Sequence, residues 1–260
     1  MNIFERDYET TKTILKKDTI THEDRMTLLG IYKVSYHDSG KIELLYSCDS
    51  SCAGCTFCQK MREAAVKNPL HICGYCYDDA QEKRWANVKN RHMLNLLIMK
   101  SVDFTEEELA TLKMNGICRL NSSGDVDNFT QANNYRKIAK SHPNVKVALW
   151  AKNVKPVEDV FDMYGKPENL IFVQSSVIIG TPGRMSRWAD YLFTVYPDEE
   201  SLQEALANGA VECNGKKCVD CGFKCYLGGW PKGANIAELL RVPEKHRAKI
   251  VEAYKNHKEE

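Results

Sequence analysis

The amino-acid sequence predicts an α/β protein with a mostly parallel sheet and cysteine-rich loops at the ends of its strands. Short apolar runs alternate with helical segments between residues 41 and 180, which is typical of parallel strands joined by crossover helices. Cysteines and polar turns follow several of these runs directly. Loops at the ends of strands carry the active sites of barrels and open α/β sheets. We therefore expect a partial or complete (β/α) barrel.

The predicted elements follow from the local patterns. Residues 26–47 alternate apolar and polar positions around the turn HDSG and predict a hairpin of two strands. The segment 77–101 has helical periodicity, and the segment 105–116 predicts a helix with Thr105 as N-cap and Gly116 at its end. The remaining predicted elements are strand 117–120, helix 131–142, strand 145–153, helix 157–165 and strand 170–180.

Two parts are expected along the 260 residues. Residues 1–211 are assigned to the barrel-like domain with the first cysteine cluster. Residues 212–260 are assigned to a cysteine-rich C-terminal extension that packs on that domain, and they end in a charged helix or frayed tail. A chain of this length buries enough surface to fold without disulfides as a substitute for a core.

Composition narrows the class of protein. The 36 basic and 35 acidic residues give a net charge of +1, which does not indicate nucleic acid, although a local basic groove stays open as an alternative. The first residues, MNIFERDYETTKTILKK, lack the apolar run of a signal peptide, and no stretch approaches the ~20 apolar residues of a membrane span. We expect no membrane partner, a cytoplasmic protein and reduced cysteines.

The first cysteine cluster organises the chain and predicts a metal site. Two spacings overlap within it, C-x3-C-x2-C and C-x2-C-x2-C, and the second is the run found in ferredoxins. A C-x2-C pair follows, immediately before a predicted helix whose N-terminus favours thiolates. The members of this cluster are Cys48, Cys52, Cys55, Cys58, Cys73 and Cys76.

A second cluster with the spacing C-x4-C-x2-C-x3-C comprises Cys213, Cys218, Cys221 and Cys225. Ten clustered thiols exceed what one four-ligand site needs, so two sites or idle thiols are both open. Fe–S clusters and Zn²⁺ share Cys₄ ligation, and the cubane-type spacings favour one or two [4Fe–4S] clusters over zinc. Cys118 lies between apolar residues and is expected in the core, and His71 is an alternative ligand.

Several segments, in order, resemble the phage "gene product 88" family over about residues 40–230: HICGYCYDDAQ, RLNSSGDV, VKVALWAKN, ENLIFVQSS and CVDCGFKCY. The positions that match the pattern of that family are Arg119, Ser123, Gly124, Asp125, Cys73, Cys76, Cys218, Cys221 and Cys225. The chain departs from the family pattern at two places. The family tends to have His at the position of Asn121 and commonly has Thr-Arg at the position of Ala151–Lys152. This resemblance implies a phage protein in the cytoplasm of an infected or host bacterial cell.

The chain is also distantly similar to radical S-adenosylmethionine (SAM) enzymes, which have a strand followed by C-x3-C-x2-C. That resemblance implies that Cys48, Cys52 and Cys55 hold a [4Fe–4S] cluster with one open iron. It also implies that residues 123–125 (Ser123, Gly124 and Asp125) form the turn that binds SAM, and Arg119 is a further candidate for binding the cofactor. Gly54 departs from the pattern, Cys58 allows another ligand set, and SSGD is alternatively an ordinary turn or helix cap.

The resulting hypothesis is an iron–sulfur protein, either a radical SAM-like enzyme acting on a small-molecule, nucleotide or macromolecular substrate, or a protein whose cluster is structural or redox-active. The alternative is a zinc- or Fe–S-stabilised binding protein without catalysis, which engages a host protein or nucleic acid. Arg119 and Lys152 project from the ends of predicted strands and are candidates for binding an anionic group, with solvated charges at the rim as the alternative.

Overall fold

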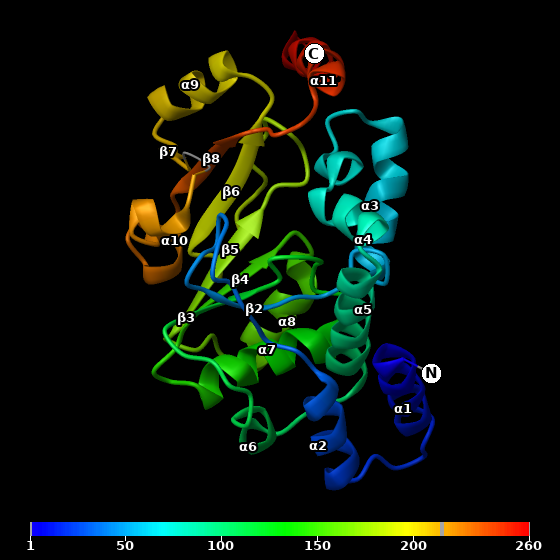
Figure 1. The fold of residues 1–260 in the computed structure, drawn as a ribbon. Coiled ribbons are helices and arrows are strands. Elements are labelled where there is room, and N and C mark those ends of the chain that lie inside the picture. The colour runs from blue at the N-terminus through cyan, green and yellow to red at the C-terminus, as the bar shows by residue number, and fades with distance from the viewer. Residues whose placement is uncertain (1, 214–215, 260) are drawn as a thin grey trace.

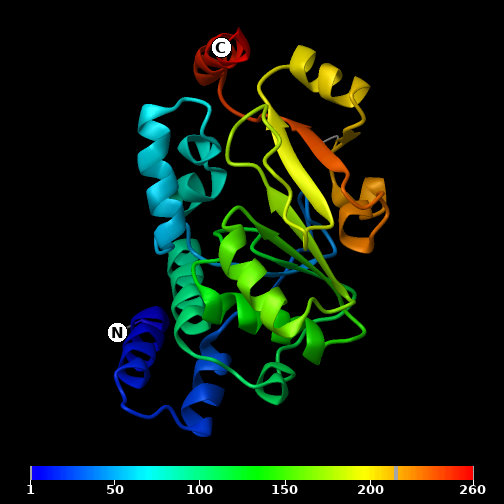
Figure 2. The same cartoon turned by 180° about the vertical axis from the view of Figure 1, so that it is seen from behind.

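An eight-stranded sheet forms the centre of the molecule, and helices pack around it (Figures 1 and 2). The computed structural model describes residues 2–213 and 216–259. The strand order is β1-β2-β3-β4-β5-β6-β8-β7, in which β1 is antiparallel to β2 and the other neighbouring pairs are parallel. The strands are β1 Ser35–Tyr36, β2 Tyr46–Cys48, β3 Ile117–Leu120, β4 Lys146–Ala151, β5 Leu170–Ser175, β6 Tyr191–Tyr196, β7 Val211–Glu212 and β8 Asn235–Leu239.

The sheet is open, and the barrel in our prediction is not confirmed. Strands β1 and β7 lie at its two edges, and each consists of two residues. Closing a barrel requires the edge strands to pair in a staggered register, and strands this short offer too few backbone groups for that pairing. The mostly parallel sheet is confirmed, and β2 to β6 are adjacent in chain order, as βαβ units predict.

Some of the helices are crossover connections between parallel strands. Helices α7 and α8 join β3 to β4 and β4 to β5, and they lie beside each other (Figure 1). The helical segments are α1 Ile3–Leu15, α2 His22–Ile31, α3 Thr56–Lys67, η1 Ile72–Tyr75, α4 Tyr77–Arg84, α5 Ala86–Ser101, α6 Glu106–Leu109, α7 Phe129–Ser141, α8 Val154–Tyr164, α9 Glu199–Ala207, η2 Cys218–Cys221, α10 Lys224–Leu227 and α11 Glu244–Glu259.

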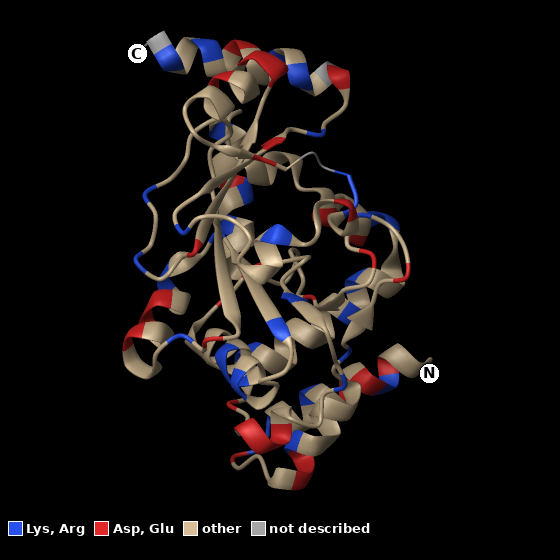
Figure 3. Ribbon diagram, turned by 90° about the vertical axis from the view of Figure 1, so that its left-hand side faces the viewer, with Lys and Arg blue, Asp and Glu red and all other residues tan. Residues whose placement is uncertain are grey.

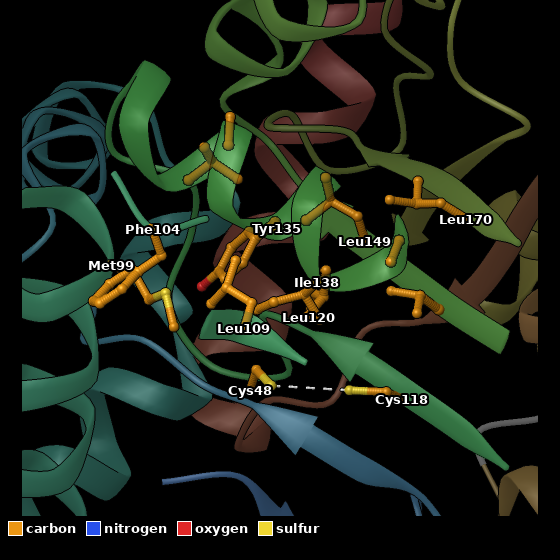
Figure 4. Close-up of a cluster of buried hydrophobic side chains, with 14 of the residues drawn as sticks. Cys48, Met99, Phe104, Leu109, Cys118, Leu120, Tyr135, Ile138, Leu149 and Leu170 are labelled. Atoms are coloured by element: carbon orange, nitrogen blue, oxygen red, sulfur yellow. Dashed lines mark hydrogen bonds between the residues drawn. The ribbon is translucent and has the colours of Figure 1, made fainter. Parts of the chain in front are cut away.

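Successive strand residues point to opposite faces of the sheet and fill two cores. Leu149 of β4 belongs to the larger core, where strand side chains meet Tyr135 and Ile138 of α7 (Figure 4). The next residue, Trp150, belongs to a second core on the other face, together with Tyr226 of α10. The alternation along β4 therefore puts the helices α7 and α8 on one face and the distal cysteine segment on the other.

The predicted hairpin over residues 26–47 is only partly correct. Residues 22–31 form α2, because Thr21 and Asp24 make a capping box that starts a helix. The antiparallel pair remains, but it is limited to Ser35–Tyr36 and Tyr46–Cys48. The local apolar alternation was therefore outweighed by the helix cap.

Other elements also differ from the predictions, including β5, which was expected over 170–180 and ends at Ser175. The helix expected over 77–101 is two helices, which meet at an extended Trp85. The helix expected over 105–116 starts at its Thr105 cap, as predicted, but α6 ends at Leu109. A helix not predicted, α3, begins right after Cys55 and carries Cys58 in its first turn.

Residues after 211 share the sheet with the rest of the chain, because β8 pairs with β6 on one side and β7 on the other. The chain ends in α11, where acidic and basic residues are interspersed (Figure 3). Within the described ranges, no helix is both long enough and apolar enough to cross a membrane.

Candidate metal centre

The loops that follow β2 and β3 lie against each other at the carboxyl ends of the parallel strands. The N–H of Asn121 donates to the carbonyl of Cys48 at 3.0 Å, and the N–H of Ser50 donates to the carbonyl of Ser123 at 3.1 Å. The pairing of β2 with β3 therefore brings the first cysteine loop next to the SSGD turn, although more than sixty residues separate them in sequence.

Four thiols of the first cluster converge beside these loops. Cys52, Cys55 and Cys58 form one buried group with Leu96, and Cys76 packs against it. The sulfurs of Cys52 and Cys76 are 3.7 Å apart, and both are free thiols. An oxygen of Asp78 joins them, so that the three ligand atoms lie within 4.8 Å of one another. This group offers thiolate ligands from a loop, from α3 and from the start of α4.

The thiols of this group influence one another's pKa values. The neighbouring Cys58 and Cys76 thiols lower the pKa of Cys52 to about 3. The same interactions raise the pKa values of Cys58 and Cys76, because a hydrogen bond between two thiols that favours one thiolate disfavours the other. The backbone N–H of Gly124 also lowers the pKa of Cys52, so the SSGD turn influences this site.

Cys48 lies elsewhere. It is the last residue of β2, and its sulfur is 3.9 Å from that of Cys118 in the larger core (Figure 4). Both side chains are fully buried, which agrees with the prediction that Cys118 is a core residue. Cys73 is buried in η1, near the four-thiol group, and burial raises its pKa. His71, the alternative ligand, is also buried, at the N-cap of η1.

Glu82 of α4 positions the cysteine loop, and it was not among the predicted site residues. Its buried carboxylate accepts the N–H groups of Cys52 and Ala53, at 3.2 and 3.0 Å, and the hydroxyl of Ser51 at 3.0 Å. The Nδ1 of His92 on α5 lies 3.3 Å from the same carboxylate. The charged run QEKR gave no sequence signal that one of its members is buried.

Asp127 holds the other end of the same loop. Its carboxylate accepts the N–H of Thr56 at 2.7 Å and the thiol of Cys55 at 3.6 Å, at the N-terminus of α3. Lys100 pairs with the carboxylate at 2.9 Å. A negative side chain is favoured at a helix N-terminus, so Asp127 stabilises the start of α3. Asp127 was not among the predicted site residues, and its position two residues after Asp125 was the only sequence signal that it lies at this site.

The predicted cofactor turn is bound largely by the chain itself. The Asp125 carboxylate accepts the N–H groups of Val126, Lys152 and Asn153, between 2.8 and 3.2 Å. Ser50 covers Gly124, where a Cβ would lie 2.2 Å from the Ser50 hydroxyl oxygen. The turn therefore links β3 to β4 and to the cysteine loop.

The distal cysteines lie across the sheet from the larger core. Cys213 follows β7, and Cys218 is buried at the start of η2, where its N–H donates to the Lys41 carbonyl at 2.7 Å. Burial and the neighbouring Cys218 raise the pKa of Cys225 to about 12. The thiol of Cys221 donates to the Cys218 carbonyl at 3.2 Å.

Arg119 and Lys152 lie between the two cysteine groups. The Arg119 guanidinium stacks 4.3 Å from the Trp150 ring centroid and donates to the Tyr226 hydroxyl at 3.2 Å. Burial alone would lower the pKa of Lys152, but the Asp125 carboxylate and nearby thiols raise it. Both residues border one cavity, together with Cys213, Cys218 and Cys225.

A comparison with protein families found that the model described as gene product 88 matches residues 5–246. Searches of the curated proteins and of the solved structures found no match. The match spans all of the strands and both cysteine clusters.

Proposed function

The chain belongs to the gene product 88 family, and we propose that it is an iron–sulfur protein whose cluster is held by Cys52, Cys55, Cys58 and Cys76. The observation that carries this proposal is the convergence of these four thiols, from three segments, in one buried group. Three of them form the C-x2-C-x2-C run of ferredoxin-type sites, which wraps one loop around a cubane.

The surroundings of the four thiols support a cluster. Thiolates need compensating positive charge or hydrogen-bond donors, and the Gly124 N–H and the positive charge of Lys152 both lower the pKa of Cys52. Glu82 and Asp127 fix the loop that carries Cys52 and Cys55 and the start of α3, which limits the rearrangement that cluster binding would require. When bound, such a cluster would supply one-electron redox chemistry or structural stabilisation.

A single zinc ion is the second candidate, and the separation between two sulfurs favours it. Tetrahedral ligands about 2.3 Å from a zinc ion are about 3.8 Å apart. The Cys52 and Cys76 sulfurs are 3.7 Å apart and already match that edge. A cubane would require the thiols to spread further, so this distance supports the zinc-stabilised binding protein.

The fit to SAM is poorer. Four thiols in one group can close a cluster, whereas SAM chemistry requires an open iron. The carboxylate predicted to bind the SAM ammonium, Asp125, accepts backbone N–H groups instead, and Ser50 fills the space above Gly124. Cys48, predicted as a ligand, lies with Cys118. Release of 5′-deoxyadenosine from SAM by the reduced protein would be the evidence for the enzyme.

Purification without oxygen, followed by metal analysis and visible absorption, tests the proposal. We expect a brown protein with about four irons and four sulfides for each cluster. A colourless protein with about one zinc for each site would overturn it in favour of the binding protein.

For the distal cysteines, we propose a second metal site. The segment around them is polar, yet Cys218 is buried and Cys213 and Cys225 border the same cavity. Replacing both Cys218 and Cys221 with Ser should lower the metal content by the amount of one site. Unchanged metal content would refute the second site and leave the first in place.

A further inference from the structure

A cavity of about 180 Å³ lies on the face of the sheet opposite the larger core, between the two cysteine groups. Arg119 of β3 and Trp150 of β4 contribute to its wall, as does Lys152 just beyond the end of β4. Cys218 and Cys225 border it from the distal segment. A cavity of this volume holds several water molecules and admits a short-chain organic acid.

Hydrogen-bond donors without partners border this cavity. The Nε of Arg119, the Nδ2 of Asn121 and the Nε1 of Trp150 are buried and have no partner in the described residues. The Asn121 amide is oriented by its own oxygen, which accepts the hydroxyls of Ser50 and Tyr135 at 3.1 and 2.9 Å. Buried donors are costly when unpaired, so three of them at one cavity indicate a ligand rich in acceptors.

The charges at the cavity point to an anion. Within the described residues, neither Arg119 nor Lys152 forms an ion pair with a carboxylate within 4.0 Å. A third cation at the wall, Lys41, is by contrast paired with Glu238 at 2.7 Å.

The carboxylates at the wall, Asp78 and Asp125, have other partners. Asp78 lies with Cys52 and Cys76, and Asp125 accepts backbone N–H groups. Neither Arg119 nor Lys152 is therefore held in a direct ion pair with these carboxylates, and both border the cavity.

We propose that this cavity binds a small organic acid through its carboxylate. The bond from Arg119 to Tyr226 uses Nη1 and leaves the Nε edge of the guanidinium, which is the edge that binds a carboxylate with two parallel bonds. Lys152 adds a point charge, and Asn121 and Trp150 add neutral donors. This inference goes beyond the proposed function, because none of these four residues is among the proposed metal ligands.

Titration of the full-length protein, purified without oxygen, tests this inference. The probes are succinate, its neutral analogue succinamide, and inorganic phosphate, each followed by tryptophan fluorescence and by the melting temperature. We expect succinate to saturate the protein below about 10 mM, the range of a weak small-molecule site, and succinamide not to bind. Saturation by phosphate but not by succinate would overturn the carboxylate assignment.

Two variants and a matched control locate the site. Arg119→Met and Lys152→Met should each weaken succinate binding roughly ten- to a hundredfold, because each removes a charge-assisted bond. Lys155→Met removes an exposed lysine three residues further along and should leave binding unchanged. If Arg119→Met does not fold, Lys152→Met decides the question alone.

Three results would overturn the inference: no saturable binding of succinate, equal binding of succinamide, or unchanged binding in Lys152→Met. Iron and zinc are measured in the same samples. A protein that binds succinate but lacks metal would refute the proposed function and leave this inference standing. A protein that holds metal but does not bind succinate would refute this inference and leave the proposed function standing.

Discussion

Gly124 lies so close to Ser50 that a Cβ atom on the glycine would be 2.5 Å from the Ser50 carbonyl oxygen. The contact joins the turn after β3 to the loop that leads to Cys52. Gly124 also has a φ of +80°, a conformation that other residues adopt only with strain. Backbone conformation and close packing therefore both require glycine at this position.

Gly124→Ala should destabilise the protein by about 2–4 kcal/mol, from the strained φ together with the clash against backbone. Gly40→Ala is the matched control, because Gly40 has a φ of +86° but nothing within 4 Å of its Cβ position. Chemical denaturation of both variants separates the two contributions. Equal losses would show that the contact with Ser50 carries no energy.

Glu82→Gln should weaken metal retention and lower the free energy of unfolding by about 2 kcal/mol. The amide group would face two backbone N–H groups and a hydroxyl that now donate to a carboxylate. Glu63→Gln, an exposed change on α3, is the control and should alter neither quantity. Metal content after dialysis and urea denaturation measure the two effects, and full retention of metal in Glu82→Gln would contradict the positioning role.

Glu108 makes the stability depend on pH. Burial raises its pKa, but the Thr105 N–H and the side chains of Arg25 and His22 outweigh burial and lower the pKa below its ordinary value of 4.5. A carboxylate with a lowered folded pKa stabilises the protein above the unfolded pKa, and this contribution is lost as the pH falls through the folded pKa.

The difference in unfolding free energy between the unaltered protein and Glu108→Gln should therefore be largest near neutral pH and shrink below about pH 4.5. Denaturation at several pH values between neutral and acid measures it. Glu63→Gln, an exposed change in the middle of α3, should show a difference near zero throughout. A difference for Glu108→Gln that stays constant with pH would contradict the proposed linkage.

The parts of the fold that local patterns determine could be predicted. The alternation of strands and helices, the Thr105 cap and the buried Cys118 follow from periodicity and side-chain type within short windows. The error over residues 22–31 has a local cause too, because the capping box of Thr21 and Asp24 starts a helix there despite the apolar alternation.

The grouping of the cysteines depends on strand register, which short windows do not determine. Tyr46 pairs with Cys118, and this register places Cys48 beside Cys118 in the core. The cysteines beyond the strand end are then free to gather with Cys76. Spacing predicted that a thiol site exists, but it could not show that the first member of C-x3-C-x2-C belongs to the sheet.

Cys48→Ala and Cys58→Ala separate these two ligand sets, because both thiols are buried and only Cys58 belongs to the four-thiol group. We expect Cys48→Ala to keep the full metal content and to lose about 1 kcal/mol of stability, since it removes one atom from the core. Cys58→Ala should lose most of the metal of this site. Metal analysis of the two variants, purified side by side without oxygen, makes the comparison.

Cys118→Ala is the control for packing, because it removes the core partner of Cys48 and lies in neither cysteine cluster. It should resemble Cys48→Ala in both stability and metal content. If Cys48→Ala instead loses metal as completely as Cys58→Ala while Cys118→Ala does not, Cys48 is a ligand. The loop after β2 would then have to rearrange on metal binding, and C-x3-C-x2-C would be the ligand set.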